Sequence, residues 1–170
     1  MDDELAEFCR AEHRRLVGAL SLYCGDRHLA EELAQDAIVR VIDNWNHVQR
    51  LQSPSAWAHR VAINLANSYL RRRFAERRAT RRLQSRPRAD HDPPDTPTAI
   101  TVRAAVAALP KRERAVVVLR FFADFSVRDV SQLLAMPEGT VKTLSARALN
   151  ALRAAGLNDL QEVTDATESS

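Results

Sequence analysis

The feature that most constrains the fold is a proline-rich stretch near the middle of the chain. Residues 87–98 read PRADHDPPDTPT, with four of the seven prolines and no large apolar side chain. Such a stretch cannot bury a helix face, and we expect it to be an extended, flexible linker. Helical spacing of apolar residues returns on both sides. The sequence therefore predicts two small domains, over 1–86 and 99–154, joined by a linker over 87–98.

Composition favours an all-α fold for both domains. Only 4 of the 170 residues are Gly and 5% are aromatic, whereas Ala, Leu and Arg are abundant. These residues favour helices over strands. The segment 155–170 carries four acids and no base, and we expect a disordered acidic tail rather than a regulatory contact.

Several classes of protein are disfavoured. No apolar run approaches the roughly 18 residues that cross a bilayer, and the acidic start MDDELAEF is unlike a secretory signal. We therefore expect a cytoplasmic protein without direct membrane insertion. No Gly-rich phosphate loop or nucleophile–base–acid set is present, so we expect no enzyme, no cofactor and no small-molecule substrate.

A metal site is also not expected. Cys9 and His13 have the spacing of paired ligands, as do Cys24 and His28. The two pairs lie roughly four turns apart on one expected helix, so they cannot share an ion.

The charge is distributed in two basic blocks. Residues 66–88 carry nine arginines and one Glu, and residues 103–153 carry nine bases and four acids, whereas the segments around them are acidic. Two separate basic blocks predict two contacts with a polyanion.

The second basic block contains a helix-turn-helix pattern. Ser126 and Asp129 have capping-box spacing, Ala135-Met136-Pro137 forms a turn, and a helix over about 137–154 follows. In this geometry the second helix inserts its N-terminal side chains into the major groove. The expected DNA contacts are Glu138, Thr140, Lys142, Thr143 and Arg147. The alternative is a helical hairpin in an ordinary bundle, with solvated charges.

The first basic block adjoins a group of residues that suits an unpaired nucleic-acid strand. The run NSYLRRRFAERRATRRLQSRPR has arginines around the helix and one acid, so we expect a nucleic-acid contact there rather than an unspecific solvated tail. Aromatic and amide groups just upstream suit an unpaired strand. These residues are Trp57, His59, Arg60, Asn64 and Asn67. Trp57 is more often a core residue than a stacking platform.

Together these segments resemble a known family. The order is AEELAQDAIVRV, AWAHRVAINLANSYLRRR, a proline-rich linker, AALPKRERAVVVLRF and MPEGTVK. It resembles the extracytoplasmic-function (ECF) group of the sigma-70 family, above all its actinobacterial members, over about residues 5–154. The turn before MPEGTVK usually holds Gly, and Ala135 stands there instead, at a cost of about 1 kcal/mol if positive φ is needed. The family's usual Ser-Arg-Leu after GTVK is Thr143-Leu144-Ser145 here.

The resemblance implies roles for each domain. Residues 1–86 would bind the −10 element and the polymerase clamp, and residues 99–154 would read the −35 element. The helix over 29–45, whose outer face would otherwise be read as solvated, would dock on the β′ coiled coil of RNA polymerase. Its candidate contacts are Gln35, Asp36 and Arg40. The melting segment 57–73 adds Arg71, Arg72 and Arg73. Expected partners are core RNA polymerase (β′ and β subunits), promoter DNA and an anti-sigma factor.

Two other functions remain open from the residues. The first is a stand-alone helix-turn-helix regulator of duplex DNA, which normally needs a dimerisation or effector-binding segment that we do not find. The second is a helical adaptor, which gives no reason for nine arginines in 66–88. We therefore expect a sigma factor that directs promoter recognition, melting and transcription initiation.

Overall fold

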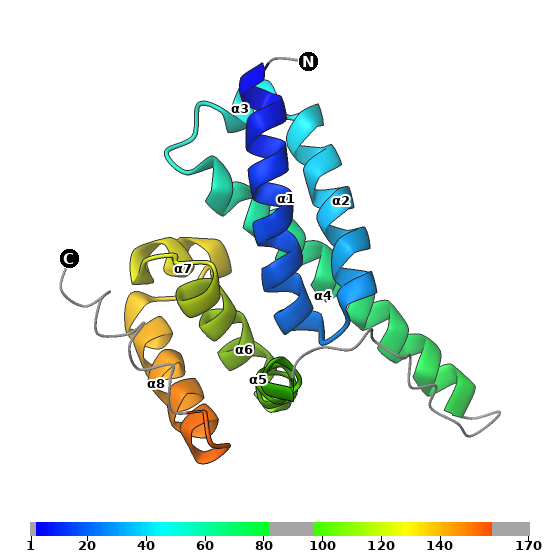
Figure 1. The fold of residues 1–170 in the computed structure, drawn as a ribbon, viewed down its shortest axis with the longest axis vertical. Coiled ribbons are helices and arrows are strands. Elements are labelled where there is room, and N and C mark those ends of the chain that lie inside the picture. Colours follow the sequence, from blue (N-terminus) through cyan, green and yellow to red (C-terminus); the bar gives the residue numbers. More distant parts are fainter. Residues whose placement is uncertain (1–2, 82–96, 158–170) are drawn as a thin grey trace.

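The computed structural model describes residues 3–81 and 97–157, and every regular element in these ranges is helical (Figure 1). The elements are α1 (Asp3–Cys24), α2 (Arg27–Asp43), α3 (Trp45–Val48), α4 (Pro54–Arg81), α5 (Pro97–Ala108), α6 (Lys111–Val117), the π-helix η1 (Val118–Phe122), α7 (Val127–Leu134) and α8 (Glu138–Ala154). The all-α prediction is confirmed. Most of the predicted linker and of the acidic tail lies outside the described residues.

Helices α1 and α2 form an antiparallel pair that α4 crosses (Figure 1). The chain leaves α1 at Gly25, whose φ of 73° suits a residue without Cβ. Asp26 then caps α2 by accepting a hydrogen bond from the backbone N–H of Leu29 at 3.0 Å. One face of α2 is buried, from Leu29 through Leu33 and Ala37 to Val41.

Helix α2 ends earlier than predicted, and the short α3 follows it. The backbone leaves helical geometry at Asn44, with φ −115° and ψ 15°. Trp45 therefore belongs to α3 and packs on Phe8 of α1, with ring centroids 5.3 Å apart. The apolar spacing from α2 continues into Trp45, so the periodicity alone did not reveal the break.

Helix α4 begins at a Ser-Pro pair, which favours a helix start. Ser53 accepts a hydrogen bond from the N–H of Ala56 at 3.2 Å, and Pro54 is the first helical residue. The first turns bury Ala58, Ala62 and Ala66 against α1 and α2. The last turns project beyond the bundle (Figure 1), and the side chains of residues 74–80 are exposed.

The second half begins with α5 and a helix that changes pitch. The helical segment from Lys111 is α-helical only to Val117 and then forms η1. The N–H of Ala123 bonds to the carbonyl of Val118 at 3.0 Å, a five-residue step. Arg120 is 8% exposed and donates to the carbonyl of Phe125 at 3.1 Å, which closes the loop after η1.

The helix-turn-helix has the predicted geometry. Ser126 accepts from the backbone N–H of Asp129 at 3.1 Å, and the Asp129 carboxylate accepts from the N–H of Ser126 at 3.1 Å, a complete capping box. Ala135 ends α7 in the left-handed region, with φ 50° and ψ 50°, so the condition under which Ala in place of Gly costs about 1 kcal/mol is met. One face of α8 is buried, from Val141 through Leu144 and Ala148 to Leu152.

The two halves pack against each other, a contact that the sequence analysis did not predict. The Arg114 guanidinium donates to the carbonyl of Tyr23 at the end of α1, at 3.1 Å, and to the carbonyls of Ala107 and Leu109 in its own half. Helix α1 contacts α5 and η1, and α4 contacts α7. Helix α8 packs on α6 and α7.

We predict that Ser126→Ala lowers the free energy of unfolding by about 1 kcal/mol, because the cap of α7 is lost. Urea denaturation measures this. Ser126→Thr keeps the hydroxyl acceptor and serves as the control, with stability close to that of the wild type. Equal stability of all three proteins would contradict the role of the cap.

Candidate nucleic-acid interface

The outer face of α8 carries the predicted duplex contacts. Glu138, Lys142, Thr143 and Arg147 are exposed, and Thr140 is half-buried. Thr143 donates its hydroxyl proton to the carbonyl of Gly139 at 2.9 Å. Together these side chains form a polar face opposite the buried line of α8, with its N-terminal part free to approach a DNA groove.

Two of the three residues that depart from the family pattern after GTVK, Leu144 and Ser145, point inward. Leu144 and Ser145 are each 9% exposed. Ser145 donates to the carbonyl of Val141 at 2.8 Å, so its hydroxyl is satisfied within the helix. The Thr143-Leu144-Ser145 sequence therefore leaves the outer face of α8 to Lys142, Thr143 and Arg147.

The predicted single-strand residues on α4 divide into exposed and packed side chains. Arg60 and Asn64 are exposed. Trp57 is half-buried and packs against the core, which is the more common role of a tryptophan. Asn67 is half-buried, and its Oδ1 accepts from the Tyr23 hydroxyl at 2.7 Å. Burial raises the pKa of Tyr23 to about 12, so the phenol keeps its proton and holds the amide of Asn67 in one orientation.

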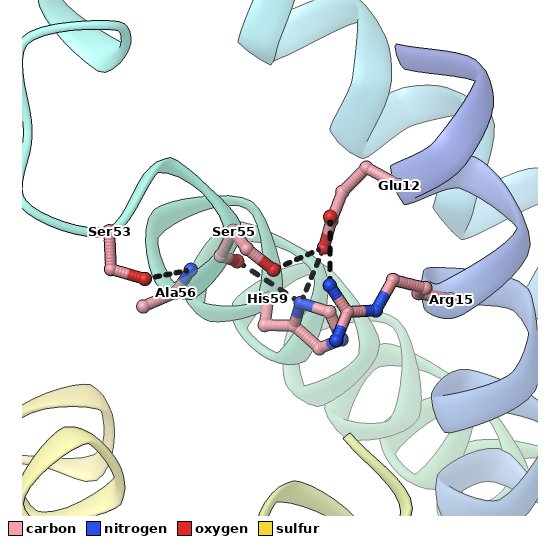
Figure 2. Close-up of polar contacts among 6 residues, drawn as sticks. All are labelled: Glu12, Arg15, Ser53, Ser55, Ala56 and His59. Atoms are coloured by element: carbon pink, nitrogen blue, oxygen red, sulfur yellow. Dashed lines mark hydrogen bonds and ion pairs between the residues drawn. The ribbon is translucent and has the colours of Figure 1, made fainter. Parts of the chain in front are cut away.

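His59 lies inside the protein rather than on the predicted DNA face. It is 1% exposed, and its Nδ1 lies 3.0 Å from Oε1 of Glu12 and 3.1 Å from the carbonyl of Ser55 (Figure 2). Both neighbours are acceptors, so Nδ1 is the nitrogen that carries a proton. This burial does not fit a direct contact with DNA.

Glu12 is the buried charge of this group. It is 2% exposed, accepts from the Ser55 hydroxyl at 2.7 Å, and lies 3.9 Å from Arg15 (Figure 2). Burial by itself raises the pKa of Glu12. Hydrogen bonds from His59 and Ser55, and the attraction of His59 and Arg15, outweigh burial and leave the pKa below its usual value.

His59 also faces the second half. Its ring meets Phe125 edge-on, with centroids 4.9 Å apart and an interplanar angle of 76°. A cavity of about 230 Å³ lies beside it. The cavity is lined by His59, Arg60, Ile63, Asn64, Asn67, Leu119, Leu133, Leu134 and Ala135. Part of the predicted −10 face of α4 therefore lies against α7 in this arrangement.

The arginine-rich part of α4 is largely exposed among the described residues. Arg71 and Arg72 are exposed and Arg73 is half-buried. Arg71 donates to the hydroxyl of Ser68 at 3.2 Å. Further along, Arg77 and Arg78 are exposed, so the end of α4 presents positive charge in several directions.

The outer face of α2 carries the predicted polymerase contacts. Gln35, Asp36 and Arg40 are exposed. Their apolar neighbours Val39 and Ile42 are 55% and 41% exposed. The three-residue spacing of this pair is out of phase with the buried line of α2, which is the signal in the sequence that both face outward. Together they form a mixed polar and apolar surface.

Other kinds of site find little support within residues 3–81 and 97–157. No group of three His, Cys, Asp or Glu side chains there could hold a metal ion. Cys9 and Cys24 are both free and lie on α1, and burial raises the pKa of the Cys24 thiol to about 12. None of the described helices has the length and apolarity that crossing a bilayer requires.

Comparison with known proteins assigns this geometry to a family. The model of sigma-70 region 2 matches residues 8–78, and that of sigma-70 region 4 matches residues 100–152. The ECF RNA polymerase sigma factor SigM of Mycobacterium tuberculosis is 32% identical over 140 residues, which cover 82% of this chain and 70% of that protein. The chain belongs to the ECF sigma factors of the sigma-70 family.

Other relatives agree with this assignment. The RNA polymerase sigma-E factor of Streptomyces coelicolor is 29% identical over 150 residues, covering 88% of this chain and 84% of that protein. The ECF RNA polymerase sigma factor SigW of Bacillus subtilis is 30% identical over 142 residues, 76% of each chain. The sigma factor RpoE of Bartonella quintana, solved with the anti-sigma factor NepR, shares the fold with a TM-score of 0.69 at 21% identity, covering 96% of this chain and 95% of that one.

Family membership decides between the functions that the residues left open. The chain is an RNA polymerase sigma factor, and a stand-alone regulator is not favoured. Sigma factors as a class are transcription initiation factors and generally carry no catalytic activity. Region 2 spans most of α1–α4, and region 4 spans most of α5–α8.

We predict that Glu12→Gln lowers the free energy of unfolding by about 1–2 kcal/mol at pH 7, because hydrogen bonds to a charged acceptor weaken. The folded-state pKa of Glu12 is lowered, so its stabilising effect is complete above the usual Glu pKa of about 4.3 and is lost as the pH falls through the lowered value. The gap to the wild type should therefore narrow at acidic pH.

Urea titrations of both proteins at a series of pH values test this. Glu7→Gln, at an exposed position of the same helix, is the control and should match the wild type throughout. A gap that stays constant down to pH 3 would show that the charge of Glu12 is not what stabilises the fold.

Proposed function

We propose that this chain brings RNA polymerase to its promoters through three surfaces on three helices. Helix α8 reads the −35 element, α4 binds the opened −10 element, and α2 binds the β′ coiled coil. One observation carries the proposal. On each of the three helices, most of the side chains predicted to bind DNA or polymerase are exposed on an outer face, and the buried His59 is the clear exception.

The −35 role rests on α8. Lys142 and Arg147 are exposed and lie on α8, the helix that follows the turn of the helix-turn-helix. Lysine and arginine in such a helix contact guanine edges or phosphates. Glu138, Thr140 and Thr143 complete the face, and the N-terminal dipole of α8 attracts phosphate groups.

The −10 role rests on α4. Arg60 and Asn64 are exposed, and Asn67 is oriented by Tyr23. Amide groups can hydrogen-bond base edges, and the exposed Arg71 and Arg72, with the half-buried Arg73, add phosphate contacts. We propose that Trp57 supports this face from the core and that His59 positions α4 through Glu12 rather than contacting DNA.

The polymerase role rests on α2. An exposed apolar pair beside Gln35, Asp36 and Arg40 is typical of a protein-binding surface, since apolar area is buried at its centre and polar groups form its rim. We propose that this surface binds β′ and that the chain also contacts β. The chain acts in the bacterial cytoplasm, and an anti-sigma factor holds it inactive, a kind of partner with which RpoE of Bartonella quintana was solved.

The decisive experiment is run-off transcription with core polymerase, this protein and a promoter library, with start sites mapped. We predict new start sites that depend on the protein. Lys142→Ala and Arg147→Ala should each reduce transcription from −35-dependent promoters by about 5- to 150-fold, the equivalent of 1–3 kcal/mol per contact. Binding of the variants to core polymerase should be unchanged. Start sites identical with and without the protein would refute the proposal.

We predict that changing Arg71, Arg72 and Arg73 together to Ala flattens the salt dependence of promoter binding. Each lost phosphate contact reduces the slope of log K against log salt by about 0.7–0.9. Binding measured by fluorescence anisotropy between 50 and 200 mM salt gives this slope. Arg10→Ala, at an exposed position of α1, is the control. A triple variant with the wild-type slope would place these arginines outside the interface.

A further inference from the structure

Among the large apolar side chains that the structure describes, that of Phe74 is the most exposed. It is 62% exposed, compared with 55% for Val39, 41% for Ile42 and 37% for Phe122. It lies in the last turns of α4, where the side chains from Phe74 to Thr80 are all exposed. A single exposed apolar residue is ordinary, so its surroundings must show whether it has a role.

Its surroundings are cationic. Between Arg71 and Arg81, α4 carries six arginines and one acid, Glu76. At 3.6 residues per turn, Arg71 and Arg78 lie directly before and after Phe74 on one face, whereas Glu76 lies on the opposite face. A partner that covers this ring must therefore be strongly negative, and a polyanion with aromatic parts meets both conditions.

Phe74 also continues the face that carries the predicted −10 contacts. Arg60, Asn64, Asn67, Arg71, Phe74 and Arg78 follow one another at alternating steps of four and three residues. This spacing places them in one stripe along α4. The stripe is turned away from the buried Ala58, Ala62 and Ala66. Arg60 and two amides occupy its first half, and two arginines with an aromatic ring occupy its second half.

We propose that Phe74 stacks on an unpaired base of the opened promoter strand. The ring lies seven residues beyond Asn67 on the same face, a rise of about 10 Å, which separates it from the amides by a few nucleotides. In a duplex each base face is covered by its neighbours, so a side-chain ring can stack only where a base is unpaired or flipped. Arg71 and Arg78 bind the flanking phosphates. This inference rests on the proposed function of α4.

The test uses holoenzyme assembled from core polymerase and the full chain. Its probe is a forked DNA whose non-template strand is unpaired across the −10 element, and binding is measured by fluorescence anisotropy. We expect Phe74→Ala and Phe74→Leu to weaken binding by roughly 5- to 150-fold, the range for loss of one stacked base. Phe74→Trp should keep near wild-type affinity, because it keeps an aromatic face.

Two controls isolate stacking from other effects. Phe122→Ala removes an exposed ring on η1 and should leave binding unchanged. An abasic scan of the unpaired strand should find one position at which the wild type and Phe74→Ala bind equally, because the base under the ring is missing.

Other results would overturn this inference alone. They are unchanged binding by Phe74→Ala, wild-type binding by Phe74→Leu, a loss of affinity for core polymerase in place of DNA, and an abasic scan without such a position. Wild-type protein that fails to bind core polymerase would overturn the proposed function together with it.

Discussion

The arrangement of this molecule depends on a carboxylate held inside a helical bundle. An ionised carboxylate is costly to bury unless it is well hydrogen-bonded. Glu12 of α1 meets this condition through His59 and Ser55, both from the first turns of α4. The contact fixes the rotation of α4 against α1. With that rotation fixed, the alanines of α4 face the core and Arg60 and Asn64 face outward.

The same histidine connects the two halves. Its ring packs on Phe125, which lies between η1 and the helix-turn-helix, while Arg114 ties the end of α1 to α5 and α6. These contacts leave the outer face of α8 open but bring α7 against part of the −10 face of α4. The two candidate DNA surfaces therefore differ in accessibility within one structure.

Much of the fold could be predicted because local chemistry specifies it. Ser53 with Pro54, and Ser126 with Asp129, start helices through backbone hydrogen bonds that need only neighbouring residues. The family's usual Gly in the turn before MPEGTVK raised the question of positive φ at Ala135, and the structure answers it with a φ of 50°. What the sequence could not predict depends on contacts distant along the chain or on backbone pitch. The break at Asn44 and the π-helix leave the apolar spacing unchanged, so periodicity does not detect them.

The site was predicted less completely, for a related reason. A pattern of side chains indicates which residues are polar, but not which of them find a buried partner. His59 stands among residues suited to DNA, yet Glu12, 47 positions earlier, draws it into the core. Conversely, Val39, Ile42 and Phe74 are exposed in the part of the chain that the structure describes. The sets on α2 and α8, whose buried lines are regular, were placed best: apart from the half-buried Thr140, all of their members are exposed.

Helix α4 packs on the core over its first half and projects from it over its second half, and this has a mechanical consequence. The packed part reaches as far as Tyr69 and Leu70, while Arg78 lies eight residues beyond Leu70, about 12 Å along the axis. A tilt of about 10° at the last packed turn would therefore move the far end by about 2 Å. Small adjustments in the core are thereby enlarged at the arginines of the exposed end.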